Sequence, residues 1–484
     1  MSSPDHSAVA GPVLFARGAD HDRCRLAALV VRRASSAAAD GPSDATPPVL
    51  RTVHGETIAP LELARLADHR FLRYDFELPV GADAWYELDG VRHAVVTDLH
   101  GDLRLAYASC NGLERGDVER PSEERNLMWR RLATEHAKAP FALLLHGGDQ
   151  LYADEASEAH PTLAAWAESA MDERDAFVFD DEVERRATRF FVERYAALYA
   201  QPDVAPLLAT VPSLMMWDDH DIFDGWGSHP PALLDSDVGR GLFAVARRAF
   251  LLFQRALSPE EGAPGASLSH ATDFPGFAVL APDLRSERRP DRVIGMQGWP
   301  LLERQLEAAE GTERVLLMSS VPLLGPRLSL VERLIGVVPR LRRYEDDLRD
   351  QWQSRAHRAE WRRLLERLER LARAGVDVTV LSGEIHLASR GEMPLGEDGT
   401  LHQLIASGVA HPAPPAGWAR ALGWLAALGE DPLEGRPVRL RPIPGRRRIY
   451  TDERNYLVLE RRAERWRAAW ECEEGGRTPW LGLG

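Results

Sequence analysis

The sequence predicts an α/β protein in which a small β-rich unit precedes a larger layered one. In residues 13–98, short runs typical of β-strands alternate with turn residues. From residue 103 onward, apolar runs of strand length alternate with amphipathic stretches of helical length. Strands that alternate with helices form sheets covered by helices, so we expect an α/β sandwich in this part. The change of pattern predicts two domains, an N-terminal β-sandwich domain over residues 1–98 and a layered domain over residues 99–484.

Four segments predict the N-terminal unit. RFLRYDFELPV (70–80) alternates polar and apolar residues, as a half-buried strand does. WYELDGVRHAVVTDL (85–99) has an Asp-Gly pair between two strand-like runs, which is typical of a β-hairpin. LELARLADH (61–69) is expected to be a helix inserted between the strands. The small, polar, Pro-containing stretch 34–48 is expected to be a loop.

The larger unit is predicted to begin with a strand and to continue with alternating helices and strands. Apolar runs that we expect to be strands are LRLAYASC (103–110), FALLLHGGD (141–149), SLMMWDDHD (213–221), GFAVLAPDLRSER (276–288), RVLLMSSVPLL (314–324) and VDVTVLSGEIHLAS (376–389). Amphipathic periodicity predicts helices over 126–138, 237–257 and 351–374. Late strands are expected to begin near residues 401, 455 and 466.

Composition argues against several classes of protein. Of the 484 residues, 44% are hydrophobic, so the chain can bury a large core and is not globally disordered. The 74 acidic and 59 basic residues give a formal net charge of -15, which argues against a protein that grips the nucleic-acid backbone. Three cysteines do not make a disulfide framework. No apolar window reaches the length of a spanning helix and no leader pattern is visible, so we expect no membrane span and a cytoplasmic location by default.

Polar residues that follow the apolar strands form the candidate site, because ligands bind at the carboxyl ends of strands in α/β folds. The first strand end is Ala-Ser-Cys-Asn, where Cys110 could be a thiolate metal ligand or a buried apolar residue. The second is Gly-Gly-Asp-Gln-Leu-Tyr (147–152), whose glycines let the chain turn sharply. Asp149 and Tyr152 are three residues apart, so one turn can present both to one ion, and a phenolate with a carboxylate suits Fe(III). The alternative is a turn in which Asp149 caps the next helix.

The third strand end carries four ionisable residues in a row, Asp-Asp-His-Asp (218–221). Asp219 can ligate a metal while the next residue, His220, points into a substrate site. Asp221 or Asp218 can hold the imidazole in one orientation, which makes His220 and Asp221 the candidate catalytic residues. A solvated acidic turn is the alternative.

The fourth strand end is Ser-Gly-Glu-Ile-His (382–386). Glu384 and His386 are two residues apart, so on an extended chain they share a face and can clasp one metal. The alternative is a core histidine beside a solvated glutamate. Near the second strand end, His146 and Asp154 are equally compatible with roles in the site and with structural roles.

The four motifs, in this order, resemble those of the calcineurin-like metallophosphoesterases, a superfamily that includes the purple acid phosphatases. Ser-Cys-Asn, Gly-Gly-Asp-Gln-x-Tyr-Ala-Asp, Trp-Asp-Asp-His-Asp and Ser-Gly-Glu-Ile-His are similar in particular to the PhoD-type alkaline phosphatases. The resemblance covers residues 103 to about 460. It implies a four-layer αββα metallophosphoesterase sandwich as the catalytic domain, preceded by the small N-terminal β-sandwich domain.

The resemblance also implies a set of metal ligands. Carried over residue by residue, it places Fe(III) on Cys110, Asp149, Tyr152 and His386. Asp149 would bridge to a second ion, which Asp219 and Glu384 would also hold. A site made only of oxygens favours Ca²⁺ or another hard divalent metal. Related dinuclear enzymes have Asn where Asp219 stands, and many PhoD-type sequences have Asp where Glu384 stands, so oxygen ligands are kept at both positions.

The function that the resemblance implies is hydrolysis of phosphate esters. A metal-bound hydroxide attacks phosphorus, the cations neutralise the developing charge, and His220 assists the leaving group. We expect a small-molecule or lipid phosphate ester as substrate, and no nucleic-acid partner. One alternative is a phosphodiesterase with phospholipase-D-like substrates. Another, from a different class, is a non-catalytic metal-binding module. Such a module would be expected to have lost metal ligands, whereas every expected ligand position is filled here.

Three further features are open to more than one interpretation. Arg285 follows the strand-like run GFAVLA and could bind a substrate phosphate, although a structural ion pair with Asp283 is the more ordinary role. Two inserts, 325–350 and 411–445, carry amphipathic stretches. Each could cover the site as a lid, touch a membrane surface or pack as an ordinary helix.

Overall fold

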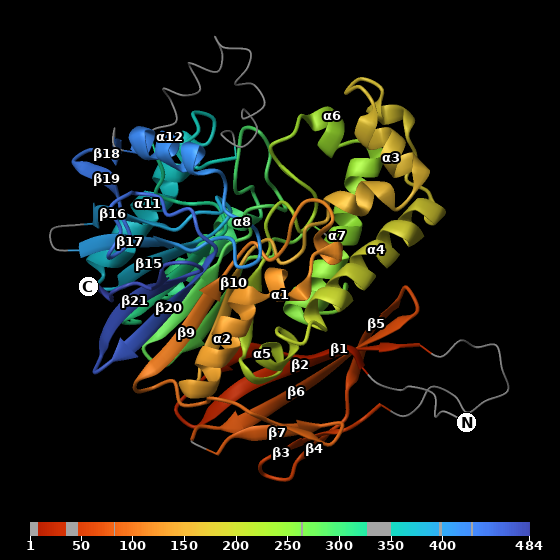
Figure 1. The fold of residues 1–484 in the computed structure, drawn as a ribbon, viewed down its shortest axis with the longest axis horizontal. Helices are drawn as coiled ribbons and strands as arrows, with labels where there is room; N and C mark the ends of the chain where they lie inside the picture. Colours follow the sequence, from red (N-terminus) through yellow and green to blue (C-terminus); the bar gives the residue numbers. More distant parts are fainter. Residues whose placement is uncertain are drawn as a thin grey trace.

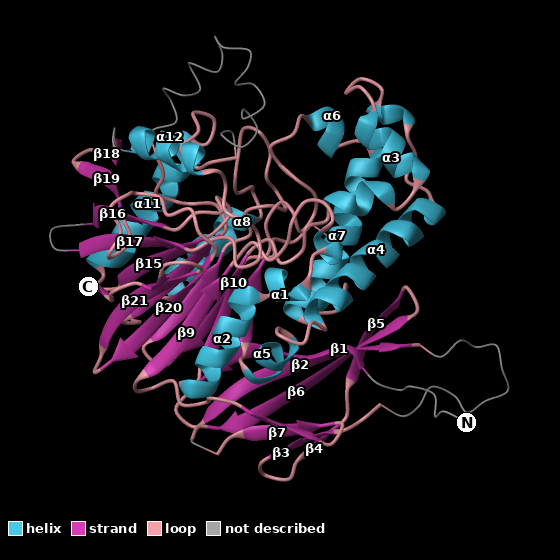
Figure 2. Cartoon of the chain, viewed as in Figure 1, coloured by secondary structure: helices cyan, strands magenta, loops and turns pink. Residues whose placement is uncertain are grey.

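Two large β-sheets pack face to face and helices cover their outer faces (Figures 1 and 2). The computed structural model describes residues 8–34, 47–81, 83–262, 265–326, 350–395, 399–426 and 429–484. The order of layers is helices, sheet, sheet, helices, which confirms the predicted four-layer αββα architecture.

The first sheet has eleven strands among the described residues, and its centre is parallel. The neighbours β9, β10 and β11 run parallel, and the two faces of this part lie against the second sheet and against helices. Its order is β22 (Gly476–Arg477), β21 (Arg465–Cys472), β20 (Asn455–Arg462), β9 (Leu103–Ala108), β10 (Leu143–Gly147), β11 (Ser213–Met216), β1 (Ala8–Ala19), β2 (Arg23–Arg33), β6 (His69–Pro79) and β5 (Leu61–Leu66), with β23 (Leu481–Leu483) paired to β21.

The second sheet has eight strands in the part of the chain that the structure describes, and it is also parallel at its centre, from β13 through β14 and β15 to β17. Its order is β12 (His270–Phe274), β13 (Phe277–Ala281), β14 (Arg314–Ser319), β15 (Asp377–Ser382), β17 (Gly399–Ile405), β16 (Ser389–Leu395), β19 (Arg436–Arg441) and β18 (Glu430–Leu433).

Alternation along the strands divides the core between the layers. Leu143 and Leu145 of β10 belong to the cluster between the sheets, and Leu144 belongs to the cluster beneath the helices. Helices on the first sheet are α2 (Leu127–Lys138), α4 (Asp181–Tyr199), α5 (Ala205–Thr210) and α7 (Asp237–Arg255), and those on the second are α8 (Gly298–Ala308) and α11 (Arg358–Arg373). Shorter helices are α1 (Ser122–Arg125), α3 (Pro161–Glu168), α6 (Pro231–Leu234) and α12 (Ala416–Ala426).

The N-terminal strands form a small β-rich unit, but they share a sheet with the rest of the chain. β1 pairs in parallel with β11, so β1, β2, β6 and β5 continue the first sheet. A separate four-stranded sheet, β4 (Thr57–Ile58), β3 (Leu50–Thr52), β7 (Trp85–Leu88) and β8 (Val91–Ala94), packs beside them at the bottom of Figure 1. The predicted boundary at residue 98 stays a prediction, and one sheet crosses it.

The expectation of a helix over 61–69 is wrong. This segment is β5 and the tight turn into β6, with Leu66 opposite His69. Ala67 and Asp68 both have positive φ, 48° and 61°, as the turn of a two-residue hairpin requires. Pairing with β6 outweighs the helix propensity of Leu, Glu, Ala and Arg. The predicted hairpin of β7 and β8 is confirmed, with Asp89 and Gly90 at its turn.

The two inserts differ in how far the structure describes them. The stretch expected to be an apolar helix within 325–350 lies almost wholly in 327–349, outside the described residues. Insert 411–445 contains α12 and the hairpin of β18 and β19. The helix expected over 351–374 begins only at Arg358. Among the described residues, no helix is long and apolar enough to cross a membrane.

Candidate metal centre

Loops at the carboxyl ends of the central parallel strands of both sheets converge on one site. Because strand ends on the same side of a sheet meet at one edge, residues far apart in the chain come together there. Cys110 follows β9, Asp149 and Tyr152 follow β10, Asp218, Asp219 and His220 follow β11, Ser320 follows β14, and Glu384 and His386 follow β15.

Four of these residues adopt the left-handed backbone conformation, which is uncommon outside glycine. Cys110, Asp149, Glu384 and His386 have φ values of 56°, 54°, 63° and 52°. They are four of the ten non-glycine residues with positive φ in the described chain, and such strain gathers at functional sites. Glu384 and His386 therefore reach the site through a tight loop rather than along the extended chain that we expected.

Two glycines let the chain pass close to its neighbours before Asp149. A Cβ on Gly147 would lie 1.9 Å from the Tyr107 hydroxyl oxygen. Gly148 has a φ of 101°, and a Cβ there would lie 2.8 Å from the Cβ of Asp218. Larger residues at either position would displace the turn that carries Asp149, so the prediction of a sharp glycine turn is confirmed.

The first cluster contains the residues expected to hold iron. Ligand atoms of Cys110, Asp149 and His386 all lie within 4.8 Å of one another. Cys110 Sγ lies 3.4 Å from Asp149 Oδ2, and the Tyr152 hydroxyl oxygen lies 2.9 Å from His386 Nε2. Burial, with the neighbouring His411 and His220, lowers the pKa of His386 well below its usual value, so its imidazole is neutral as a metal ligand must be.

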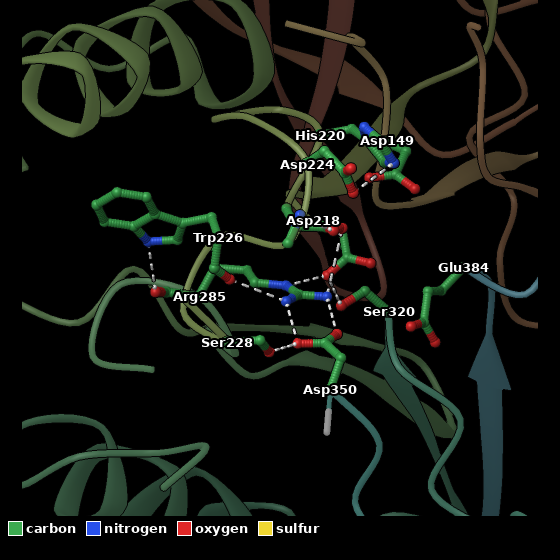
Figure 3. Close-up of polar contacts among 12 residues, drawn as sticks. Asp149, Asp218, His220, Asp224, Trp226, Ser228, Arg285, Ser320, Asp350 and Glu384 are labelled. Atoms are coloured by element: carbon green, nitrogen blue, oxygen red, sulfur yellow. Dashed lines mark hydrogen bonds and ion pairs between the residues drawn. The ribbon is translucent and has the colours of Figure 1, made fainter. Parts of the chain in front are cut away.

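The second cluster differs in one member from the expected set. Carboxylate oxygens of Asp149, Asp218 and Asp219 all lie within 4.8 Å of one another. Glu384 lines the same cavity, and its two oxygens accept hydrogen bonds of 2.9 and 3.0 Å from Gln351 Nε2. Figure 3 shows Glu384 apart from Asp218, on the other side of Ser320 in this view.

The donor atoms fit bound cations. Oδ1 of Asp149 and Oδ2 of Asp218 are buried and have no hydrogen-bond partner within the part of the chain that the structure describes. Burial raises the pKa of Asp149 well above its usual value, and the charges of Cys110 and Asp218 raise it further. Buried carboxylates without partners are costly unless a cation neutralises them. Thiolate, phenolate, imidazole and carboxylate together match the ligand set of a transition metal, and the carboxylates alone match a hard divalent ion.

His220 is held by Asp154 rather than by its neighbours in sequence. His220 Nδ1 donates to Asp154 Oδ2 at 2.9 Å, and its ring stacks on Tyr152 with centroids 4.2 Å apart. Burial favours the neutral imidazole, but the carboxylates of Asp154 and Asp219 raise its pKa well above the usual value. Ligand atoms of Asp219, His220 and Asp224 also lie within 4.8 Å of one another, so the geometry allows His220 to be a ligand as well as an acid.

Asp221 is not the hydrogen-bond partner of His220, which is Asp154. Asp221 is fully buried and accepts hydrogen bonds from the backbone N–H groups of Asp149, Leu151 and Asp218 at 2.9 to 3.0 Å. Tyr195 and Gln254 donate to it as well. The prediction that Asp221 orients His220 is therefore corrected. Asp221 instead fixes the two loops that follow β10 and β11.

Arg285 was predicted as a substrate-binding residue, and the structure gives it another environment. Its side chain is 0% exposed. It pairs with Asp218 through Nε and with Asp350 at 2.7 Å, and Nη1 donates to the carbonyl of Trp226 (Figure 3). A guanidinium enclosed in this way cannot clamp a phosphate, so Arg285 is a structural group behind the site. Asp218, not Asp283, is its carboxylate partner at the strand end.

The site opens into a cavity of about 370 Å³. Residues of the two clusters contribute to the polar part of its lining, called the floor here, and apolar side chains form the remainder, called the apolar wall. Lining residues of the polar side are Glu114, Asp149, Asp219, His220, Asp224, Gln351, Glu384 and His386, and lining residues of the apolar side include Pro322, Leu324, Ile385, Pro414, Leu422 and Tyr450.

Several site residues were not predicted from the sequence. His411 stacks on His386 with centroids 3.5 Å apart and lies 3.0 Å from Glu114, whose pKa His411 lowers to about 2 against the effect of burial. It follows β17, so the rule of polar residues at strand ends could have found it. No sequence signal identifies Asp350 and Gln351. His146 bonds to Gln150 and Ser213 and has a structural role.

Comparisons with known proteins give a match to one family model and a match to one solved fold. The sequence model of the family described as PhoD related phosphatase matches residues 110–344. A solved structure titled as that of PhoD superposes with a TM-score of 0.58 at 12% identity, covering 99% of this chain and 90% of the other, which shows the fold.

A curated protein of Saccharomyces cerevisiae, described as uncharacterized, is 26% identical to this chain. The match covers 66% of this chain and 56% of the yeast protein. The chain therefore spans little more than half the length of that relative.

Proposed function

We propose that this chain, a PhoD-type protein by its motifs, its family match and its fold, is a metal-dependent phosphoesterase. The observation that supports this most directly is the convergence of Cys110, Asp149 and His386, since Asp149 and His386 also line a cavity. Asp149 also belongs to the carboxylate group with Asp218 and Asp219, so it can serve two neighbouring cations. Adjacent cations that face a cavity suit a phosphate ester, whose oxygens carry the charge.

Bound cations would activate a water molecule as Lewis acids and neutralise charge on the phosphate oxygens. The chain's own residues hold the geometry. Asp154 fixes the His220 ring, Tyr152 stacks on it, and His220 lines the cavity. In this position His220 can give a proton or a hydrogen bond to the departing oxygen of the ester. Gln351 fixes Glu384 on the opposite side.

We assign Fe(III) to the cluster of Cys110, Asp149, Tyr152 and His386. A thiolate and a phenolate on Fe(III) absorb visible light, so protein purified without chelators should be coloured and should contain iron. Ca²⁺ or another hard divalent ion is assigned to the carboxylates around Asp219. A colourless, active enzyme that contains only zinc or magnesium would overturn the iron assignment and leave the phosphoesterase standing.

A phosphodiesterase is the second candidate within the same chemistry. The cavity of about 370 Å³ extends beyond the clusters to an apolar wall, so an ester with a sizeable organic group has room. We propose that the substrate is a small-molecule or lipid phosphate ester of either kind.

Turnover of p-nitrophenyl phosphate and bis(p-nitrophenyl) phosphate tests the function. Protein as purified should hydrolyse at least one of them, should lose this activity when its metals are removed, and should regain it when they are returned. Undiminished activity after complete metal removal, or no turnover of either ester by metal-loaded protein, would contradict the proposal.

A further inference from the structure

The cavity has an apolar wall in addition to its metal-ligand floor. Leu422 of α12 lies in it with Ile385 and Tyr450, and these three side chains belong to one hydrophobic cluster with Leu387 and Leu440. The wall is therefore a packed surface supported from behind rather than a single apolar side chain. α12 lies near the top of Figure 1, above the second sheet.

The wall begins within one residue of the metal ligands. Ile385 stands between Glu384 and His386, and all three line the cavity. Pro322 and Leu324 extend the apolar surface from the loop that follows β14. A phosphate ester whose phosphorus lies at the clusters would have its organic group beside this surface.

The charges in the cavity oppose a second anionic group on the substrate. Glu114 and Asp224 add carboxylates to those of the floor. Among the described residues that line the cavity, none is Lys or Arg, and Arg285 is enclosed by carboxylates behind the site. Within the described lining, a second phosphate group of a polyphosphate or sugar diphosphate would meet no Lys or Arg side chain, whereas a neutral apolar group would meet a matching surface.

We propose that the apolar wall is a specificity subsite for the alcohol part of the ester, so that the enzyme selects phosphate esters of apolar alcohols over those of hydrophilic ones. The inference rests on the proposed function, because it takes the ester phosphate to lie at the metal clusters. Burial of each methylene against the wall raises kcat/KM by roughly three- to fourfold. Alkyl and aryl groups are both apolar and could both bind this wall. The substrate series below shows which of the two is preferred.

The test compares esters that differ only in the organic group. One series consists of p-nitrophenyl phosphodiesters whose second group is methyl, propyl, hexyl, phenyl or 2,3-dihydroxypropyl, and a second consists of the corresponding monoesters. We expect kcat/KM to rise from the methyl to the hexyl ester. We also expect kcat/KM for the propyl ester to be at least tenfold higher than for the dihydroxypropyl ester. A higher kcat/KM for the phenyl ester than for the hexyl ester would identify aryl groups as the preferred ones.

Variants of α12 connect the preference to the wall. Leu422→Ser should flatten the dependence of kcat/KM on chain length, and Leu422→Met should keep this dependence. Trp424→Ser is the matched control, since Trp424 lies on the same helix and is 79% exposed. Unchanged chain-length dependence in Leu422→Ser would overturn the assignment of the wall.

Binding of methyl-, propyl- and hexylphosphonate, measured by calorimetry, separates the two proposals. Affinity that rises with chain length in a protein that hydrolyses no ester would overturn the phosphoesterase and support the subsite. Hydrolysis with equal rates for propyl and dihydroxypropyl esters would overturn the subsite and support the phosphoesterase.

Discussion

His220 and Asp221 are neighbours in the sequence, yet their side chains have different tasks. His220 Nδ1 bonds to Asp154 and the ring lines the cavity, whereas Asp221 accepts hydrogen bonds from two loops and from Tyr195 and Gln254. Within this turn, the side chain of residue 220 lines the cavity, whereas that of the next residue is buried in the core. The two residues are therefore expected to respond differently to substitution.

His220→Ala should lower kcat by roughly 10²–10⁴, the range for loss of a general acid–base group. The loss should be smaller for nitrophenyl esters than for alkyl esters, because nitrophenolate leaves without a proton. Asp154→Asn should act in the same direction, by roughly 10- to 100-fold. Metal content is measured beside turnover. Equal losses on both kinds of ester, with part of the metal gone, would mean that His220 is a ligand, as its distance to Asp219 also allows.

Asp221→Asn should chiefly lower stability. The amide can replace one carboxylate oxygen as an acceptor, and its NH₂ group then faces buried donors that lose their partner, at about 1–3 kcal/mol each. Urea unfolding should show a loss of about 2–4 kcal/mol in Asp221→Asn and a much smaller one in Asp154→Asn. Lost turnover at unchanged stability in Asp221→Asn would restore its predicted catalytic role.

At the scale of elements, buried ion pairs join the loop after β13 to Asp350. Asp350 contacts Arg285 at 2.7 Å and Arg288 at 2.9 Å, and Ser228 donates to it (Figure 3). Burial opposes its ionisation, but these two arginines keep the pKa of Asp350 below its usual value. The next residue, Gln351, holds Glu384, so this anchor also positions one side of the cavity.

Asp350→Asn should therefore destabilise the protein by about 3 kcal/mol, since it removes a buried carboxylate that pairs with the guanidinium groups of Arg285 and Arg288. Asp377→Asn is the matched control, because Asp377 pairs with Arg314 at 2.7 Å but its side chain is 59% exposed. Its loss should be under about 1 kcal/mol. Equal losses in urea unfolding would show that the buried network contributes no more than a surface pair.

Elements also show what local sequence patterns can predict. The apolar runs of β9, β10, β11, β14 and β15 are identifiable because strands buried on both faces are apolar throughout. The rule that ligands gather at the carboxyl ends of such strands is then enough to assign Cys110, Asp149 and His386 to one site. Burial of Arg285 and the partners of Asp221 depend on contacts between distant segments, which no local pattern encodes. The helix expected at β5 is wrong for a similar reason, since pairing with β6 decides the conformation of that segment.

At the scale of the whole molecule, the first sheet joins the N-terminal strands to the central strands of the site. β11 lies between β10 and β1, and residues of β1 and β2 contribute to both large hydrophobic clusters. This continuity was not predictable, because parallel pairing of β1 with β11 joins residues about 200 positions apart, Phe15 and Ser213. The local sequence predicts which segments form strands, but it does not predict which sheet each strand joins.

A chain that begins at residue 99 should therefore fail to fold. Its loss of β1, β2 and β6 would expose the edge of β11 and open both clusters. Solubility and far-ultraviolet circular dichroism compare it with the full chain. A soluble, cooperatively melting fragment would instead support the domain boundary predicted at residue 98.

Asp149 tests the central claim most directly, because its carboxylate lies in both candidate metal clusters. Metal content by elemental analysis and turnover of the nitrophenyl esters should be measured on Asp149→Ala and on the unaltered protein, with circular dichroism to show that the fold is kept. Our account predicts that the variant stays folded and loses metal and activity together. Full metal content with full turnover in Asp149→Ala would contradict it.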